Sequence, residues 1–146
     1  MSVTESNKAV IRKLYDVALN KRRLDLLQDL IAEEYTGPQG QKGAAGFEAP
    51  VAPLINAFPD MQWNIETLIA EGDEVVVSWK LTGTHTGQFT YIAPTGKMVT
   101  SGGMGIYLLK DGKVTASNIY TDRLGFLQAL DVLPQDIGTL YTIKQQ

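Results

Sequence analysis

The hydrophobic positions at the start of the chain recur at helical spacing. Between Val10 and Ala18 five apolar residues fall on one side of a helix, which Ser6 is placed to cap and which should end near Asn20. Leucines then recur at the same spacing, which predicts a second helix from about Leu24 to Ala32.

A glycine-rich segment follows these two helices. From Gly37 to Gly46 a glycine stands at every third position, as in collagen, but four glycines are too few for a triple helix. We therefore expect a loop. Pro50 suits the first turn of a short third helix, which Pro59 should end.

From Met61 onward the hydrophobic period changes from helical spacing to two, the period of strands. Gly72-Asp73 and Asp111-Gly112 are typical tight turns of hairpins, and a last helix should begin at Asp122 or Arg123. The strands are expected at residues 62–71, 74–84, 98–110 and 113–121. Helices followed by long antiparallel strands predict an α+β fold, with N-terminal helices packed on a strongly curved antiparallel sheet that forms a cone with an internal pocket.

Length and composition agree with one domain. The chain has 146 residues, of which 44% are hydrophobic, and a formal net charge of −3 gives it no electrostatic preference for nucleic acid. No apolar stretch approaches the ~20 residues that span a bilayer, so no membrane partner is expected. The first residues do not resemble a signal segment, and the expected location is the cytoplasm.

The amino-acid composition excludes several kinds of chemistry. The chain has no cysteine and a single histidine, which excludes thiolate nucleophiles and zinc–cysteine sites, and no acidic cluster has the spacing of metal ligands. Nucleophile elbows, phosphate-binding loops and dinucleotide fingerprints are also missing from the sequence. We therefore expect a protein that uses neither a metal nor a cofactor.

Asp122, at the end of the fourth predicted strand, is the strongest candidate for acid–base chemistry. It shares strand parity with a row of small and apolar residues that runs from Val114 to Tyr120. If that row faces inward, the carboxyl group is desolvated, and desolvation raises the pKa of a carboxyl group toward the range useful for catalysis. The alternative is that Asp122 caps the last helix by accepting a hydrogen bond from the Gly125 amide, which would have the opposite effect.

His85 lies in the segment from Gly83 to Gly96, upstream of the strand that leads to Asp122. An imidazole exchanges protons near neutral pH, so His85 could polarise a carbonyl group or act with Asp122. A single histidine near a strand end is equally compatible with a packed residue that makes structural hydrogen bonds.

Aromatic and polar residues of the predicted strands and first helix are candidates for the lining of the pocket. Such residues could hold a small hydrophobic molecule, while a few polar groups orient it; their alternative role is to fill the core. The candidates are Tyr15, Trp63, Trp79, Phe89, Tyr91, Tyr107, Asn118 and Tyr120.

Several short motifs resemble those of one protein family in order and spacing. The chain is similar to SnoaL-like polyketide cyclases or "ester cyclases", within the nuclear-transport-factor-like superfamily that includes ketosteroid isomerase. The resemblance covers residues 6–134 of the single domain 1–146 and leaves 135–146 as a tail. The motifs are Gly43-Ala-Ala-Gly-Phe47, Ala57-Phe-Pro-Asp60, Ala70-Glu-Gly-Asp73, Gly83-Thr-His-Thr-Gly87, Pro94-Thr-Gly-Lys97, Asp111-Gly-Lys113 and Asp122-Arg-Leu-Gly-Phe-Leu-Gln-Ala-Leu130.

The resemblance implies roles for two residues. In the catalytic members of the family, the aspartate that closes the last strand is acid and base in an aldol ring closure, and Asp122 stands at that position. The histidine of the Gly-Thr-His motif, here His85, lines or borders the pocket in this family. The superfamily also forms homodimers frequently, and a homodimer is expected here.

Two functions from different classes remain open after these observations. The first is an enzyme without a cofactor that moves a proton on a small hydrophobic carbonyl or epoxide compound, with aldol cyclisation, isomerisation and hydration all compatible. The second is a non-catalytic module that binds a small ligand or a protein partner. Removal of the Asp122 charge should affect turnover in the first case and mainly stability in the second.

Overall fold

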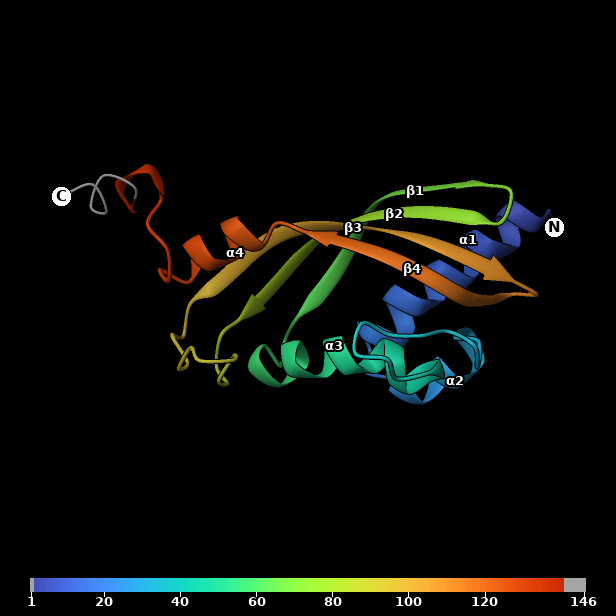
Figure 1. The fold of residues 1–146 in the computed structure, drawn as a ribbon, viewed down its shortest axis with the longest axis horizontal. Helices are drawn as coiled ribbons and strands as arrows, with labels where there is room; N and C mark the ends of the chain where they lie inside the picture. Colours follow the sequence, from blue (N-terminus) through green and yellow to red (C-terminus); the bar gives the residue numbers. More distant parts are fainter. Residues whose placement is uncertain (1, 141–146) are drawn as a thin grey trace.

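A computed structural model describes residues 2–140, in which four antiparallel strands form an open sheet in the order β1-β2-β3-β4. Helices α2 and α3 lie under one side of the sheet, and α1 runs from the N-terminus down along it (Figure 1). The core fills the space between these helices and the sheet. The predicted α+β fold is confirmed.

The first helix begins earlier than predicted. Helix α1 spans Val3–Lys13, and the side chain of Ser2, not Ser6, caps it by accepting a hydrogen bond from the Glu5 amide at 3.2 Å. The prediction that Ser6 caps the helix is wrong, because the helix begins one turn earlier and Ser2 caps it there. The helix continues as a π-helix, η1 (Leu14–Leu19), and Asn20 follows it at the predicted end.

The second predicted helix is broken and shorter. A 3₁₀ turn, η2 (Leu24–Leu26), leads into α2 (Leu27–Leu30). The helix ends there because Ile31 forms a parallel bridge with Val114, and the next amide, that of Ala32, donates a hydrogen bond to the Val114 carbonyl oxygen at 2.9 Å.

The glycine-rich segment is only partly a loop. Helix α3 (Gly43–Ala57) begins inside it and carries Pro50 in its interior, so Pro50 does not mark the first turn as expected. The start is fixed earlier because the Gly43 amide donates to the Tyr35 carbonyl oxygen at 2.7 Å. Any side chain at Gly46 would collide with the backbone of Gln41, which explains one of the repeated glycines.

The four strands have the predicted bounds. The turn before β2 has Gly72 at positive φ, and the turn before β4 has Asp111 and Gly112 at φ values of 51° and 79°, as a type I′ turn requires. Helix α4 (Arg123–Ala129) follows β4 and projects beyond it (Figure 1). The strands are β1 (Gln62–Glu71), β2 (Glu74–Thr84), β3 (Met98–Lys110) and β4 (Lys113–Thr121).

A β-bulge changes which side of β4 faces the core. Leu109 pairs with Val114, but Leu108 pairs with Ala116, so Thr115 is an extra residue in the ladder. Because side chains alternate along a strand, one extra residue moves every later side chain to the other face. Val114 is buried, whereas Asn118 is exposed, so the row of residues expected to share one inward face is divided.

Within residues 2–140 no helix has the length and apolar character needed to cross a membrane. The tail expected at 135–146 is described only as far as residue 140, and residues 141–146 lie outside the described part of the chain.

Candidate functional site

A cavity of about 410 Å³ lies between the sheet and the helices. Its walls come from η1, the segment before α3, α3 itself and all four strands, and most of the wall residues are apolar. Its polar or aromatic wall residues are Tyr15, Tyr35, Thr36, Phe47, Trp63, Trp79, Tyr107, Ser117 and Thr121.

Two buried tyrosines of this cavity are hydrogen-bonded to each other. The hydroxyl oxygens of Tyr15 and Tyr107 lie 2.5 Å apart, although the residues are 92 positions apart in the chain. Burial raises the pKa of Tyr15 well above its ordinary value, and the neighbouring Tyr107 raises it further. Burial also raises the pKa of Tyr107, while the hydrogen bond with Tyr15 partly opposes that effect. Both hydroxyl groups are therefore protonated near neutral pH.

The local backbone explains how this pair is formed. Tyr15 lies in the π-helix η1, a rare conformation that is often found at functional sites. Tyr107 lies on β3, two residues after Gly105, where an added Cβ would come within 2.8 Å of the Tyr107 ring. Gly105 therefore leaves the space that the ring occupies. At Gly105 the group that needs this space is thus a side chain of the protein itself.

A second polar pair lies on the same cavity. The Tyr35 hydroxyl and the Ser117 hydroxyl are 2.9 Å apart. Sequence reasoning did not select either residue, because Ser117 reaches the inner face only through the bulge at Thr115. No pattern in the sequence marks that bulge.

A smaller hollow of about 180 Å³ adjoins the cavity and contains Asp122 in its wall, with Arg123 from the start of α4. The two spaces are adjacent because five wall residues belong to both. The shared residues are Pro50, Leu54, Trp79, Leu81 and Thr121.

Asp122 caps α4 from an exposed position. Its Oδ1 accepts a hydrogen bond from the Gly125 amide at 2.9 Å, so the predicted cap is confirmed. The expectation of a carboxyl group buried in an inward row is wrong, because the bulge at Thr115 changes the parity and Asp122 lies past the strand end. A Cβ at Gly125 would overlap the Asp122 carboxylate, so the glycine is needed for this geometry.

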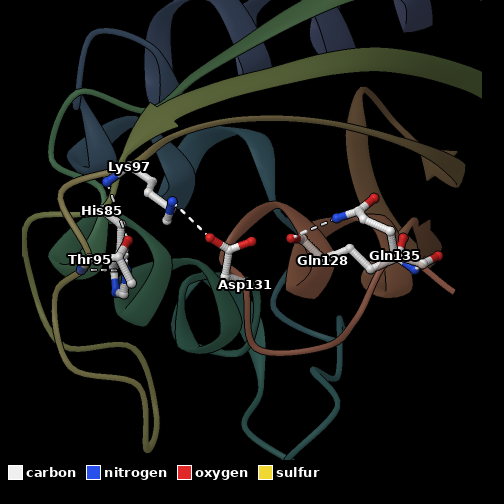
Figure 2. A network of polar contacts seen from close by, with 6 residues as sticks. All are labelled: His85, Thr95, Lys97, Gln128, Asp131 and Gln135. Atoms are coloured by element: carbon white, nitrogen blue, oxygen red, sulfur yellow. Dashed lines mark hydrogen bonds and ion pairs between the residues drawn. The ribbon is translucent and has the colours of Figure 1, made fainter. Parts of the chain in front are cut away.

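His85 lies in the core and in the wall of neither space. Its side chain is 0% exposed and stacks on Phe58 with ring centroids 5.0 Å apart. Nδ1 accepts a hydrogen bond from the Thr95 amide at 3.2 Å, which places the ring proton on Nε2, and the Thr95 hydroxyl lies 3.0 Å away (Figure 2). Among the described residues Nε2 has no hydrogen-bond partner. The lysine of this loop, Lys97, pairs with Asp131 after α4 at 2.8 Å (Figure 2).

The other expected wall residues fall into two groups. Trp63 and Trp79 join Tyr15 and Tyr107 in the larger cavity, and Phe89 lies in the wall of the smaller hollow. For three residues the prediction that they line the pocket is wrong, because they are exposed and line neither space. These residues are Asn118, Tyr120 (60% exposed) and Tyr91 (100% exposed). The first two point outward as a result of the bulge, and Tyr91 lies in the loop before β3.

The described residues 2–140 contain no group of three or more histidine, aspartate or glutamate side chains arranged to hold a metal ion. The polar groups in the walls of the two spaces are the Asp122 carboxylate, the Arg123 guanidinium and several hydroxyls, and the remaining walls are mostly apolar.

The sequence profile of one family matches this chain. The SnoaL-like polyketide cyclase profile covers residues 9–130, so the chain belongs to that family. Membership supports a cyclase or isomerase type of role. A comparison with curated proteins gives no match.

Solved structures of similar proteins agree with this assignment. A proposed polyketide cyclase from Acidithiobacillus ferrooxidans is 29% identical, with a TM-score of 0.78 over 90% of this chain and 99% of that one. A proposed SnoaL-like polyketide cyclase from Jannaschia sp. CCS1 is 26% identical, with a TM-score of 0.80 over 92% and 97%. AclR from Streptomyces galilaeus, a proposed hydroxylase, is 23% identical with a TM-score of 0.80 over 99% and 92%, and shows the shared fold alone.

Proposed function

We propose that this protein is an acid–base enzyme that acts without a cofactor on a hydrophobic carbonyl compound, with Asp122 as the group that takes and returns the proton. One observation carries the proposal: Asp122 lies in the wall of a hollow that adjoins a large, mostly apolar cavity. The cavity would hold the body of the substrate, and its reacting carbon would lie beside Asp122.

The surroundings of Asp122 fit this role. Oδ1 is held by the Gly125 amide, and no ion pair among the described residues engages the carboxylate, so Oδ2 is available to accept a proton. A ligand in the hollow would exclude water from the carboxylate, since Phe89 and Phe126 lie in the same wall. Loss of water makes a carboxylate a stronger base.

Family membership favours proton transfer in a cyclisation or isomerisation. Both reactions begin when a base removes a proton from the carbon beside a carbonyl group, and epoxide hydration would use the same carboxylate on water. His85 receives no part in the proposal, because its ring packs in the core outside both spaces. The alternative is a ligand-binding module in which Asp122 only caps α4.

Exchange of carbon-bound protons with deuterium tests the proposal without knowledge of the natural substrate. The probe is 2-tetralone, a hydrophobic ketone, and NMR measures the exchange of its α-protons in D₂O. We expect wild-type protein to catalyse this exchange and Asp122→Asn to lower the rate by about 10²- to 10⁴-fold. Asparagine caps helices as well as aspartate does, so the midpoint of unfolding should stay the same.

Asp122→Ala is the matched variant that removes the cap as well as the carboxylate. It should lose the exchange activity and also about 1 kcal/mol of stability. Equal exchange rates for wild type and Asp122→Asn would favour the ligand-binding module instead.

We also propose a homodimer formed through the outer face of the sheet. Figure 1 shows α2 and α3 on the other side of the sheet, and four large apolar residues of the outer face are exposed. A second copy is the simplest partner for such a face. Sedimentation should show a dimer that Met104→Glu and Leu108→Glu disrupt, and a monomeric wild type would refute it. The four residues are Ile69 (59% exposed), Met104 (38%), Leu108 (44%) and Tyr120 (60%).

A further inference from the structure

Trp79 is a buried residue whose indole N–H has no partner in the folded chain. The residue is 4% exposed, and among the described residues its N–H donates no hydrogen bond. Nε1 is nevertheless not enclosed, because the only described side-chain polar atoms that are both enclosed and unpartnered are Arg22 Nε and His85 Nε2. The N–H therefore borders open space, and Trp79 lies in the walls of both the larger cavity and the smaller hollow.

A glycine and a second aromatic ring fix the position of this indole. Gly103 of β3 pairs with Trp79, and a Cβ at Gly103 would come within 2.8 Å of the indole ring and 3.0 Å of its Nε1. The edge of the ring that carries the N–H thus occupies the space that a side chain at Gly103 would fill. Tyr15 packs against the same indole with ring centroids 5.2 Å apart, so the ring has little room to turn.

This position brings the N–H toward the strand that leads to Asp122. Trp79, Gly103 and Thr121 form one row across β2, β3 and β4, because Trp79 pairs with Gly103 and Gly103 pairs with Thr121. Asp122 follows Thr121 directly, and Trp79 and Asp122 both lie in the wall of the hollow of about 180 Å³. Pockets for whole drug-sized ligands measure about 300–1,000 Å³, so this hollow takes one end of a ligand, such as a carbonyl group and the carbons beside it.

The other hydrogen-bond donors of the hollow are engaged or exposed. The Ser101 hydroxyl donates to the backbone carbonyl oxygen of Asp122 at 3.4 Å, and Thr121 and Arg123 are exposed to water. Water competes with a ligand for an exposed donor, whereas a donor in a water-poor wall interacts more strongly with a charge that develops beside it. Trp79 combines burial with an unused donor, which makes its N–H the best placed group of this wall.

We propose that the Trp79 N–H donates a hydrogen bond to the reacting carbonyl oxygen of the substrate. This inference rests on the proposed function, which places the carbon that loses its proton beside Asp122. The reacting carbonyl group then lies in the hollow between Trp79 and Asp122, and the apolar body of the substrate extends into the larger cavity. The hollow thereby selects which carbonyl group reacts, namely one at an end of the substrate narrow enough to enter it.

The donor takes part in proton transfer in a defined way. As Asp122 Oδ2 takes the proton from the carbon beside the carbonyl group, the electrons of that C–H bond form a C=C bond and the π electrons of the C=O bond move onto the oxygen. The oxygen then carries negative charge next to the Trp79 N–H, which stabilises it more than it stabilises the neutral ketone. Return of the proton from Asp122 to carbon restores the ketone, with nothing added or lost.

NMR of the indole N–H tests this contact directly. The chain has two tryptophans and therefore two indole signals in a ¹⁵N–¹H spectrum, which Trp63→Phe assigns. The probes are 2-tetralone and tetralin, the matched hydrocarbon that has the same aromatic ring but no carbonyl group. We expect the Trp79 proton signal to lie at lower field with 2-tetralone than with tetralin, because a proton donated to an oxygen is deshielded.

Replacement of Trp79 by 3-benzothienylalanine, which has sulfur in place of the N–H, gives the second readout. Tetralin should bind as tightly as it does to wild type, whereas 2-tetralone should bind roughly three- to tenfold more weakly. Exchange of the α-protons of 2-tetralone should slow roughly 10²-fold. Gly103→Ala removes no donor but displaces the indole, and it should also slow the exchange. Circular dichroism establishes that each variant is folded.

Two results would overturn the inference: the same position of the Trp79 signal with 2-tetralone and with tetralin, or a wild-type exchange rate in the folded benzothienylalanine protein. Asp122→Asn separates the inference from the proposed function, because this variant should lose the exchange and keep the shift of the Trp79 signal. A shift in wild-type protein without any catalysed exchange would refute the proposed acid–base role and leave the Trp79 contact standing.

Discussion

The two ends of the interior contain equally buried polar groups that are used in different ways. At one end, Tyr15 and Tyr107 are 2% and 0% exposed, bond to each other and line the large cavity. At the α4 end, His85 is also 0% exposed, but it stacks on Phe58 and bonds to Thr95 of its own loop. One group faces a space that a ligand can enter, and the other is surrounded by protein.

This difference shows that burial of a polar side chain does not by itself indicate a binding role. A buried polar group that fills the core contributes to stability through its contacts with the protein, as the His85 ring does with Phe58, although His85 Nε2 has no hydrogen-bond partner among the described residues. A buried polar group beside a cavity retains hydrogen-bonding capacity that only a ligand can use. The two ends should therefore respond to mutation in different measurements: stability at the α4 end, and ligand binding at the tyrosine end.

The largest expected effect on stability is that of His85→Ala. Removal of a fully buried ring that stacks on Phe58 leaves a cavity, and we expect a loss of about 3 kcal/mol in the free energy of unfolding, measured with urea. Thr95→Ala removes one hydroxyl contact of the same ring and should cost only about 0.5–1 kcal/mol. Binding of 2-acetylnaphthalene, a hydrophobic ketone, should be the same in both folded variants as in wild type.

Weaker binding of 2-acetylnaphthalene by folded His85→Ala would contradict the comparison, because it would mean that the two ends are coupled through the core. An effect of His85→Ala no larger than that of Thr95→Ala would show that the ring contributes little to packing.

A smaller effect is expected at Gly105, beside the tyrosine end. An added Cβ would come within 2.8 Å of both the Ile119 side chain and the Tyr107 ring, so Gly105→Ala should cost about 1–3 kcal/mol and displace the Tyr107 hydroxyl. The matched control is Gly102→Ala on the same strand, where the new methyl group would meet only the Trp79 carbonyl oxygen at 3.8 Å. Urea unfolding measures the loss of stability, and binding of 2-acetylnaphthalene measures the change at the cavity wall.

Equal stability of Gly105→Ala and Gly102→Ala would show that the Tyr107 ring can move without cost. The tyrosine pair would then be less firmly positioned than its burial indicates.

Much of the fold could be predicted from the sequence because its signals are local. Alternation of apolar residues and two turn motifs, Gly72-Asp73 and Asp111-Gly112, placed all four strands at their observed bounds. The helices were less predictable because their ends depend on distant contacts: α2 ends where Ile31 meets Val114 of β4. The start of α3 likewise depends on the bond from Gly43 to Tyr35.

The site was harder to predict because one extra residue changes the face of a strand. Parity counted from Val114 selects Asn118 and Tyr120, whereas the bulge at Thr115 brings Ser117 and Thr121 to the cavity instead. A bulge is a property of the pairing between two strands, and no residue type in β4 indicates where it occurs.

The sequence also did not indicate which of the polar residues matter most at the site. A single histidine within a glycine-rich motif draws attention, but its packing against Phe58 depends on contacts that the folded chain creates. The bond between Tyr15 and Tyr107 joins residues 92 positions apart and requires both the π-helix and the space left by Gly105. Sequence reasoning could name both tyrosines as wall residues, but could not bring their hydroxyls together.

Alkaline pH separates the tyrosine end from the rest of the molecule. Burial raises the pKa of both Tyr15 and Tyr107 above the ordinary value of 10.0, so between that value and their folded values the unfolded chain releases protons that the folded chain retains. The folded state then binds more protons than the unfolded state, and stability must fall as pH rises through this range. Each tyrosine can contribute up to about 1.4 kcal/mol per pH unit. Urea unfolding at about pH 9 and about pH 11 should show this loss in wild type and a smaller loss in Tyr15→Phe/Tyr107→Phe, because phenylalanine has no proton to release. The same loss in both proteins would mean that the pair ionises as exposed tyrosines do, which would contradict its burial beside the cavity.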